Sequence, residues 1–228
     1  FVEELRGDGP LVDHNARLER DEFDPVVDHL LLVDTRRDPD AGEYVVGAYR
    51  LLRSQVAEEF GRYYCDSEYD LTPLRQSGRR LVELGRSCVD PAYRGGSGMF
   101  LLWNALADYV LAHDIEILFG VASFHGTRIE PLAQALSWLH HHHLAPEALR
   151  PVARAPYYQR MDLIAPEALD RRAAMTAMPA LIKAYLRLGG VVGDGAWIDH
   201  EFNTTDVFLL MDTAAMSERH RQYYQDRR

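Results

Sequence analysis

The segment over residues 81–112 constrains the fold of this chain most, because it joins a strand to a helix through a glycine-rich loop. The apolar run over 81–89 predicts a buried strand, and the pair Asp90–Pro91 predicts a turn at its end. A second apolar run predicts a helix over 97–112. Between the turn and this helix lie Arg94, Gly95, Gly96, Ser97 and Gly98. A unit of this kind is typical of α/β folds.

The glycine-rich loop predicts an anion-binding site. The first backbone N–H groups of a helix have no partner within the helix, and the helix dipole places partial positive charge at the same end. Both features favour a phosphate there, and the guanidinium of Arg94 adds a fixed cation. We therefore expect a phosphate-bearing donor to be held by Arg94, Gly95, Gly96 and Gly98. The alternative is a glycine-rich turn that binds no ligand.

The rest of the chain alternates further strands with helices. Apolar or alternating runs predict strands over residues 29–35, 44–52, 115–122, 196–198 and 207–211. Helices are expected over 11–18, 54–64, 129–139 and within 165–188, with a glycine-rich break over 189–196. This order predicts an α/β sheet, and a length of 228 residues fits one domain over 1–228.

Composition excludes several classes of function. The formal net charge of −10 argues against nucleic-acid binding. The two cysteines, Cys65 and Cys88, are too few for a disulfide framework. No run of about 20 apolar residues predicts a transmembrane helix, and no signal peptide is visible, so we expect a cytoplasmic protein.

Two acidic clusters lie beside aromatic residues, just outside the predicted strands. The first contains Asp24, followed by Asp28 and His29, and the second contains Glu68 and Asp70. Carboxylates in such positions can bind an ammonium group or accept a proton. They also serve as helix caps and solvated surface, and spacing alone does not separate these roles.

Glu83 and Arg86 are charged residues within the apolar strand over 81–89, where each needs a partner or a task. Three positions apart on a regular strand, they are expected on opposite faces. Glu83 could act as a general base and Arg86 could bridge strands or contact a phosphate, while a structural ion pair explains either residue equally well. Cys88 lacks an evident His or Lys activator in the sequence, and we interpret it as a small buried residue.

Two polar runs have more than one interpretation. The run over 203–206 fits either a capped turn or the lining of an acyl or amine pocket. The four consecutive histidines, His140, His141, His142 and His143, suggest a metal site. Consecutive residues of one element cannot all converge on a single ion, and no Cys-x-x-Cys pair is close enough to complete a zinc site. We expect no metal and interpret the histidines as hydrogen-bonding groups, with His140 or His143 placed to face the cleft.

Several segments, taken in order, resemble one known family. They are residues 65–71, 83–89, 118–124, 139–146, 193–196 and 202–207. The set resembles the ornithine N-alpha-acyltransferases, which belong to a hemolysin-like branch of the GNAT superfamily, and the similarity extends from about residue 23 to 211. It implies a GNAT-like fold with a central mixed and twisted sheet flanked by helices. An extension over 1–20 and a helical insertion over 140–190 would complete the domain.

The resemblance implies an enzyme that transfers a 3-hydroxy fatty acyl group from acyl carrier protein to the α-amine of L-ornithine. The product would be lyso-ornithine lipid. Superfamily loops usually follow the pattern Arg/Gln-x-x-Gly-x-Gly/Ala, whereas glycines follow Arg94 directly here. This departure favours a carrier protein, with its single phosphate, over coenzyme A. The phosphopantetheine arm is then the donor substrate, no other cofactor is expected, and peripheral association with the inner membrane surface is a further expectation.

The implied chemistry assigns roles on the predicted strands. Glu83 is the first choice of general base, and Asp28 with His29 is the second. A backbone N–H group near Ser87 or Cys88 would hold the thioester oxygen. The bound amine attacks directly, so no covalent enzyme intermediate is required.

Binding of the amino acid calls for negative charge near the acceptor amine. We expect the δ-ammonium of ornithine to be neutralised by the acidic residues Asp24, Glu68 and Asp70, with Arg86 also in the amine site.

Two alternatives remain open. The front half also resembles acyl-homoserine lactone synthases, through the run Glu19-x-Asp21-x-Phe23-Asp24, the strand over 47–52 and the run Glu83-Leu84-Gly85-Arg86. The tryptophan expected before the last run is replaced by Val82, which leaves those enzymes, or another N-acyl amino acid synthase, as the second choice. A non-catalytic protein that binds acyl carrier or a membrane surface is the third, with residues 173–188 as an interfacial helix.

Overall fold

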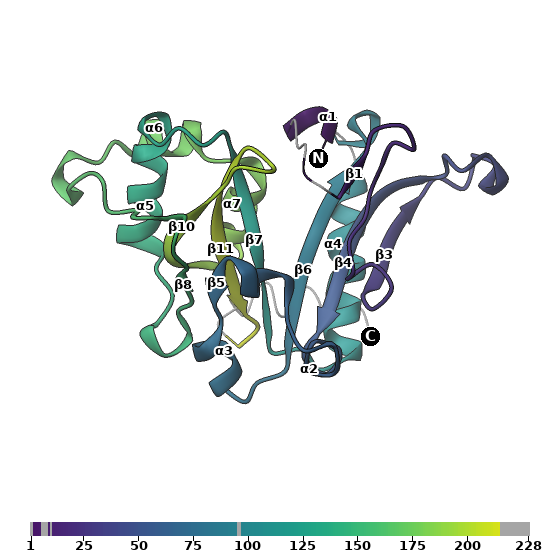
Figure 1. Ribbon diagram of the computed structural model, residues 1–228, viewed down its shortest axis with the longest axis horizontal. Coiled ribbons are helices and arrows are strands. Elements are labelled where there is room, and N and C mark those ends of the chain that lie inside the picture. Colours follow the sequence, from purple (N-terminus) through teal and green to yellow (C-terminus); the bar gives the residue numbers. More distant parts are fainter. Residues whose placement is uncertain (1, 6–8, 10, 95–96, 215–228) are drawn as a thin grey trace.

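A computed structural model describes residues 2–5, 9, 11–94 and 97–214 (Figure 1). Its centre is a nine-stranded sheet with the strand order β3-β4-β6-β7-β11-β10-β8-β5, and β9 pairs with β10. The long strands are β3 (Asp28–Val33), β4 (Val45–Arg53), β6 (Leu81–Val89), β7 (Ile117–His125), β10 (Val191–Asp199) and β11 (Thr204–Asp212). The short strands are β5 (Tyr69–Asp70), β8 (Val152–Ala153) and β9 (Tyr158–Gln159), and a separate ribbon pairs β1 (Val12–Asp13) with β2 (Leu18–Glu19).

The pairing of β6 with β7 decides the shape of the molecule. These central strands run parallel and pair only over Leu81–Glu83 and 117–119. Beyond that point they diverge, and Figure 1 shows them as the two arms of an open angle. β3 and β4 continue the sheet on one arm, and β11 and β10 continue it on the other. The two halves of the sheet therefore meet at a short vertex.

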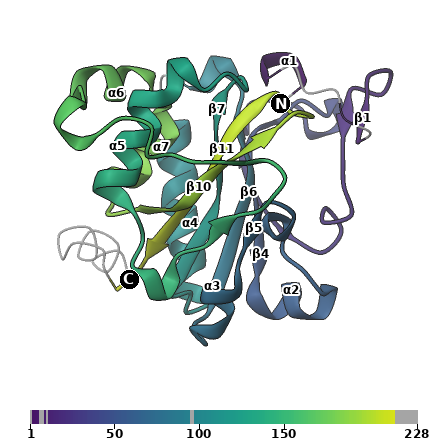
Figure 2. The same ribbon diagram turned by 60° about the vertical axis from the view of Figure 1, so that its left-hand side comes forward.

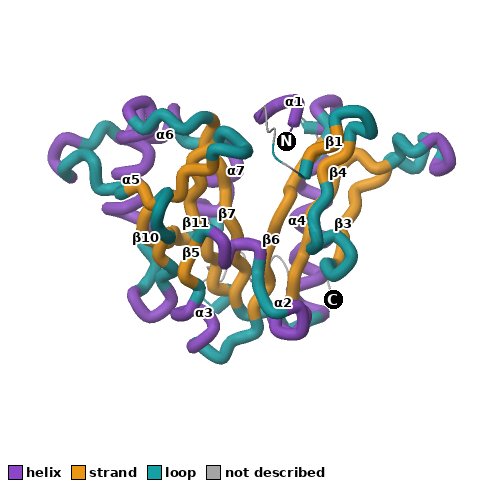
Figure 3. Tube along the Cα trace, in the orientation of Figure 1, coloured by secondary structure: helices purple, strands orange, loops and turns teal. Residues whose placement is uncertain are grey.

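Helices cover the sheet on both sides (Figures 2 and 3). They are α1 (Val2–Leu5), α2 (Ser54–Phe60), α3 (Thr72–Gln76), α4 (Gly98–Ala112), α5 (Ala133–His143), α6 (Arg171–Ala177) and α7 (Ala180–Arg187). Single 3₁₀ turns are η1 (Pro39–Ala41), η2 (Tyr64–Ser67), η3 (Pro91–Tyr93), η4 (Glu130–Leu132), η5 (Glu147–Leu149) and η6 (Pro166–Ala168). None of these described helices is long and apolar enough to cross a lipid bilayer.

Two apolar cores lie on opposite faces of the sheet. Side chains alternate between the faces of a strand, and β11 accordingly sends Val207 and Leu209 into one core and Phe208 and Leu210 into the other. The first core packs against α4, α5 and α7 through residues such as Leu102, Leu136 and Ile182. The second packs against α2, η2 and α3 through Ala57, Cys65 and Leu74. The lining of the candidate site includes residues of both cores, such as Leu84 of the first and Leu52 of the second.

The predicted strands and most predicted helices are present, and four local predictions differ from the structure. Residues 11–18 form the β1–β2 ribbon instead of a helix. The helix expected within 165–188 is two helices, because Met178 precedes Pro179 and adopts an extended conformation (ψ 130°). The expected break over 189–196 is mostly β10, and the helix predicted over 129–139 continues to His143.

Candidate active site

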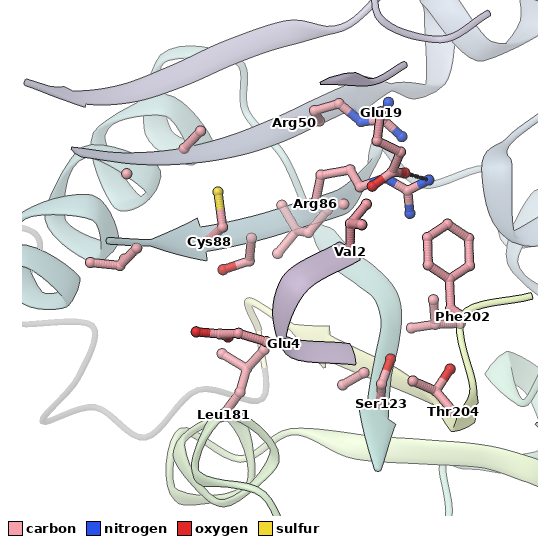
Figure 4. A pocket seen from close by; sticks show the side chains of 18 of the residues that line it. Val2, Glu4, Glu19, Arg50, Arg86, Cys88, Ser123, Leu181, Phe202 and Thr204 are labelled. Atoms are coloured by element: carbon pink, nitrogen blue, oxygen red, sulfur yellow. Dashed lines mark ion pairs between the residues drawn. The ribbon is translucent and has the colours of Figure 1, made fainter. Parts of the chain in front are cut away.

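A cleft of about 1160 Å³ lies between the diverging strands β6 and β7 (Figure 4). Figure 4 shows Arg86 and Cys88 of β6 on one wall, and Ser123 and Thr204 on the other. The short helix α1, with Val2 and Glu4, passes across the opening. The cleft therefore runs from the vertex of the sheet to the N-terminal segment.

A β-bulge in β6 shapes the wall of this cleft. Ala48 of β4 pairs with Cys88, and Arg50 pairs with Gly85, so β6 contains one residue more than β4 over the same length. Arg86 takes up the extra length with a positive φ of 47°. The bulge interrupts regular pairing between Gly85 and Cys88. Ser87 and Cys88, the two residues expected to hold a thioester oxygen, both line the cleft.

Because of the bulge, the side chains of Glu83 and Arg86 do not point to opposite faces as expected. On a regular strand they would point to opposite faces, but both contact Tyr64. The Glu83 carboxylate accepts the backbone N–H of Tyr64, whereas the Arg86 guanidinium lies over the Tyr64 ring. The two side chains therefore share one side of β6, and both line the cleft.

Glu83 is a buried carboxylate with both oxygens engaged. Oε2 accepts a hydrogen bond from Tyr64 N at 2.8 Å, and Oε1 accepts one from Cys65 N at 2.7 Å. Burial raises the pKa of Glu83, and the hydrogen bonds around Cys65 and Tyr64 oppose that rise. Glu83 thus holds η2 against the sheet while its carboxylate forms part of the cleft.

Arg86 and Arg50 form an ion-pair network with the acidic run before β3. Arg86 Nη2 lies 2.7 Å from Glu19 Oε1 and 3.6 Å from Asp21 Oδ2. Arg50 Nη1 donates to Asp21 at 2.7 Å and to Asp24 at 2.8 Å. The network fixes the N-terminal segment along the cleft. It also engages Asp24, which was predicted to bind the amine substrate.

Three buried carboxylates meet at the floor of the cleft, at Glu68, Asp199 and Asp206. Each offers an oxygen atom that lies within 4.8 Å of the other two. They come from distant segments: Glu68 follows η2, Asp199 ends β10, and Asp206 lies within β11. Glu68 was predicted for this site, Asp206 lies in the run over 203–206 for which a pocket lining was one of two interpretations, and Asp199 was missed.

The electrostatics of the site raise the pKa of two members of this acidic trio, Glu68 and Asp206. Burial, followed by the negative charges of Asp206 and Asp199, raises the pKa of Glu68 well above its usual range. Burial also raises the pKa of Asp206 to about 6, opposed by a hydrogen bond from the Ser123 side chain. The Arg86 charge lowers both pKa values but does not cancel the effect of burial.

The burial pattern of β11 singles out Asp206. In β11 the eight residues from Thr204 to Met211 are all buried, and Asp206 is the charged one among them. A charge within a buried strand requires a partner or a task, which is the argument that singled out Glu83. The run over 203–206 had two interpretations, and Thr204 and Asp206 line the cleft.

Arg94 lies at the open end of the cleft, before α4. Its Nε donates to the Val89 carbonyl at 2.7 Å, and its Nη1 lies 2.7 Å from Glu4 Oε1. The hydrogen bond from Arg94 lowers the pKa of Glu4. Gly98 is the first residue of α4, while Gly95 and Gly96 lie outside the described residues.

The other predicted acidic residues lie away from the cleft lining. Asp28 accepts hydrogen bonds from the Tyr109 hydroxyl at 2.6 Å and from Arg53 Nε at 3.2 Å. The exposed His29 contacts the backbone carbonyl of Asp24 at 3.0 Å. Asp70 accepts the backbone N–H and the hydroxyl of Thr72 at the start of α3. The structure therefore does not bring these three residues to Glu83.

Cys88 differs from the sequence-based interpretation. The expected hydrogen bonding of the histidine run is confirmed at His141 and His142, whereas the expected position of His140 or His143 facing the cleft is wrong. Cys88 is exposed on the cleft wall instead of buried. The four histidines form the last turn of α5 and lie outside the cleft lining. His141 Nε2 contacts the Ile164 carbonyl at 3.0 Å, and the His142 ring stacks on Trp138 at 4.0 Å. They connect α5 to its surroundings instead of facing the cleft.

Comparison with known proteins places this arrangement in a class. The family described as "Acetyltransferase (GNAT) domain" matches residues 1–104. The CoA-dependent acyl-homoserine lactone synthase BjaI, in a structure with MTA, has a similar fold: the TM-score is 0.50 at 17% sequence identity, covering 99% of this chain and 75% of that one. The fold is that of a GNAT-type acyltransferase, which confirms the predicted fold class of a mixed sheet flanked by helices.

Sequence relatives identify the family within that class. The L-ornithine N(alpha)-acyltransferase of Rhodobacter capsulatus is 70% identical over 224 residues, which cover 98% of this chain and 86% of the relative. The proteins of the same name from Rhizobium meliloti and Agrobacterium fabrum are 43% and 42% identical, cover 98% of this chain, and are themselves covered to 76% and 77%. The chain belongs to the L-ornithine N(alpha)-acyltransferase family and is an N-acyltransferase, as the sequence resemblance predicted.

Proposed function

We propose that the protein transfers a 3-hydroxy fatty acyl group from the phosphopantetheine thioester of acyl carrier protein to the α-amine of L-ornithine. The observation that carries this proposal is the opening between β6 and β7, where the bulge at Arg86 leaves Ser87 and Cys88 on the wall of a cleft of about 1160 Å³. The acceptor follows from the family, whose members named above are L-ornithine N(alpha)-acyltransferases. A cleft of this volume has room for the reacting ends of both substrates.

In this proposal the phosphopantetheine arm of the donor enters the cleft at its open end. Arg94 and the N-terminus of α4 would hold its phosphate, and the arm would follow β6 toward the bulge. Glu4 pairs with Arg94, so a phosphate must replace a carboxylate at that guanidinium. Arg94 is then bound by one anion or the other, which gives the donor a measurable competitor within the chain.

The reaction forms one amide bond and breaks one thioester bond. The α-nitrogen of ornithine, after losing a proton from its ammonium form, attacks the carbonyl carbon. A backbone N–H at Ser87 or Cys88 would donate to the carbonyl oxygen as negative charge develops there. The carbon–sulfur bond then breaks, and the sulfur leaves as the thiol of the carrier. The net products are the N-acyl amino acid, the free carrier thiol and one proton.

Glu83 is the general base in this mechanism, directly or through one water molecule. It is a buried carboxylate on the cleft wall, and burial raises its pKa, which makes it a better proton acceptor than an exposed carboxylate. Asp28 and His29 lie outside the cleft lining and are not retained for this step.

The decisive experiment is product analysis by mass spectrometry. Purified protein is incubated with long-chain 3-hydroxyacyl carrier protein and L-ornithine, and the amide is located on the α- or the δ-nitrogen by fragmentation. We expect the α-amide, and weaker turnover when the acyl group is presented on coenzyme A. Release of free fatty acid alone would overturn the proposal, as would a lactone formed only when S-adenosylmethionine replaces ornithine.

A further inference from the structure

We propose that Glu68, Asp199 and Asp206 form the receptor for the side-chain ammonium group of the acceptor, and that they select a diamino acid over a neutral amino acid. The inference rests on the proposed function, because it concerns the amino acid that is acylated in this cleft. It goes further by assigning selectivity to three residues, of which Asp199 and Asp206 have no role in the acyl transfer itself.

The geometry of the three carboxylates suits an ammonium group. An ammonium nitrogen donates hydrogen bonds of about 2.9 Å in tetrahedral directions, which places its acceptor oxygens about 4.7 Å apart. One oxygen from each carboxylate lies within 4.8 Å of the other two. Because the three residues come from η2, β10 and β11, folding alone brings them to this spacing.

The site contains buried acceptors that lack donors. Oε2 of Glu68 and Oδ1 of Asp206 have no hydrogen-bond partner among the described residues, although these side chains are only 2% and 4% exposed. The hydroxyl of Thr204, which is 1% exposed, lies near Asp206 and also completes no hydrogen bond of normal geometry. Figure 4 shows Thr204 on the wall of the cleft. An unsatisfied buried acceptor is unfavourable, so a ligand donor would be favoured here.

Cations are few around the trio in the part of the chain that the structure describes. Arg86 is the cation that acts on Glu68 and Asp206, yet its guanidinium is 2.7 Å from Glu19 and 3.6 Å from Asp21. Lys183, the one lysine of the chain, donates to the Met175 carbonyl on another element. The three carboxylates therefore share one arginine with two further carboxylates. A ligand cation would supply the missing charge.

Of the three carboxylates, Asp199 is held by a backbone hydrogen bond. Oδ1 of Asp199 accepts the backbone N–H of Phe202 at 2.8 Å, which ties this carboxylate to the turn between β10 and β11. Glu68 and Asp206 make no such contact through their unpartnered oxygens. Asp199 is thus the positioned member, and substitution of Glu68 or Asp206 tests ammonium binding with less effect on that turn.

The test compares L-ornithine with L-norvaline, which has the same carbon chain and lacks the terminal amine. Wild-type protein should prefer ornithine by about 10²-fold or more in kcat/KM, the scale expected for a buried charge pair. Glu68→Gln and Asp206→Asn should each raise KM for ornithine at least about tenfold and leave kcat/KM for norvaline within about twofold. Asp162→Asn, which alters an exposed carboxylate paired with Arg160, is the matched control and should behave as wild type.

A second measurement needs only wild-type protein. Titration calorimetry in buffers of different ionisation enthalpy reports the protons released on binding. Near pH 6, ornithine should release protons from Glu68 and Asp206, because an incoming ammonium group favours ionised carboxylates. Norvaline should release none there. This readout holds even where a substituted chain is too unstable to assay.

Three outcomes would overturn the inference. Equal use of ornithine and norvaline by wild-type protein is one, and an equal loss of both substrates in the folded variants is another. Stoichiometric zinc, manganese or calcium that is bound by wild type and lost from Glu68→Gln would assign the trio to a metal instead. In each case the proposed acyl transfer stands, whereas failure to acylate any amino acid would refute the proposed function itself.

Discussion

Glu83 serves the fold and the proposed chemistry with the same carboxylate. Its two oxygens accept the backbone N–H groups of Tyr64 and Cys65, so Glu83→Gln exchanges one acceptor for a donor. One buried N–H then loses its partner, which should lower the free energy of unfolding by about 1–3 kcal/mol. If Glu83 is the general base, the substitution should also lower kcat. We expect kcat of Glu83→Gln to fall by about 10²-fold or more. Both quantities are measured, by urea unfolding and by steady-state kinetics.

The control for this prediction is Asp66→Asn. Asp66 Oδ2 accepts the backbone N–H of Tyr63 at 2.7 Å, so this carboxylate fixes the same N-terminal end of η2 from outside the cleft lining. Asp66→Asn should loosen the same turn and keep kcat within a few-fold. A similar loss of kcat in both variants would mean that Glu83 acts by positioning η2. A normal kcat in Glu83→Gln would mean that another group accepts the proton of the amine.

Asp206 makes stability depend on pH in a direction opposite to that of most carboxylates. Burial raises its pKa from 3.8 to about 6 in the folded chain. Between these values the folded state keeps a proton that the unfolded chain releases, so the free energy of unfolding decreases as pH rises. The loss attributable to this group is on the order of 2–3 kcal/mol. Asp206→Asn removes it, so the variant should gain stability relative to wild type between pH 4 and pH 7, as measured by urea unfolding. A constant difference across that range would contradict the assigned pKa.

At the residue scale, sequence reasoning found residues whose chemistry is local and missed those brought together by folding. Glu83 was predicted because it is a charge within an apolar strand, and the structure places it on the cleft wall. Asp199 and Asp206 approach Glu68 only after β10 and β11 join the sheet. Asp28 and Asp70 are also acidic residues beside the predicted strands, yet Asp28 pairs with Arg53 of β4 and Asp70 caps the start of α3. Proximity in sequence does not distinguish these cases.

The vertex between β6 and β7 is the element on which the cleft depends. Gly120 lies one residue beyond their last pair, and a Cβ atom there would be 2.3 Å from the Leu84 carbonyl oxygen. Gly120→Ala must therefore push the strands apart where they should meet. We expect a loss of several kcal/mol in stability, comparable to overpacking in a core, and a lower kcat from a displaced cleft wall.

Gly85→Ala is the matched control for the vertex. It lies on β6 beside the same vertex, and its Cβ would approach only Arg50 Nε, at 3.9 Å. Its melting temperature should stay within a few degrees of wild type, whereas that of Gly120→Ala should fall clearly. Equal melting temperatures for the two variants would show that the strands are not in close contact at Gly120.

The elements differ in how much of them the sequence could predict. β6 and α4 followed from their apolar runs, because each is a continuous element that ends at a turn or a glycine-rich loop. The first part of β10 was not predicted as a strand, because its glycines suggested a break. Gly195 has a positive φ of 77°, and a Cβ there would be 2.3 Å from the Tyr158 ring, so a glycine required by a close strand neighbour looked like a break. That neighbour, β9, is two residues long and gave no pattern of its own.

Helix α1 offers a test of the donor site. Glu4 and Arg94 are both about half exposed, and exposed ion pairs contribute about 0–1 kcal/mol. Arg94→Ala should raise KM for acyl carrier protein and reduce its dependence on salt. Glu4→Gln should lower the same KM by up to about fivefold, since Arg94 is then free for the phosphate. The effect of Glu4→Gln on KM should vanish in the Arg94→Ala background. An effect that persists there would show that Glu4 does not compete with the phosphate for Arg94.

The whole molecule consists of two half-sheets joined at the short pairing of β6 with β7, and the cleft lies between them. The donor side is built by β4, β6 and α4, and the acidic trio lies toward β10 and β11. A reaction in this arrangement requires acyl donor and amino acid to be bound together. Under the proposed function each half would contribute one substrate site, and the vertex would set the distance between them.

Simultaneous binding predicts sequential kinetics. Initial rates measured against ornithine at several concentrations of acyl carrier protein should give intersecting lines in a double-reciprocal plot, as direct attack by the bound amine requires. The alternative is an acyl-enzyme intermediate on Cys88, whose thiol is exposed in the cleft. Parallel lines and an acylated Cys88 in intact-protein mass spectrometry would support that route. We expect neither, and Cys88→Ala should keep most of the wild-type kcat because the thiol has no step in direct transfer.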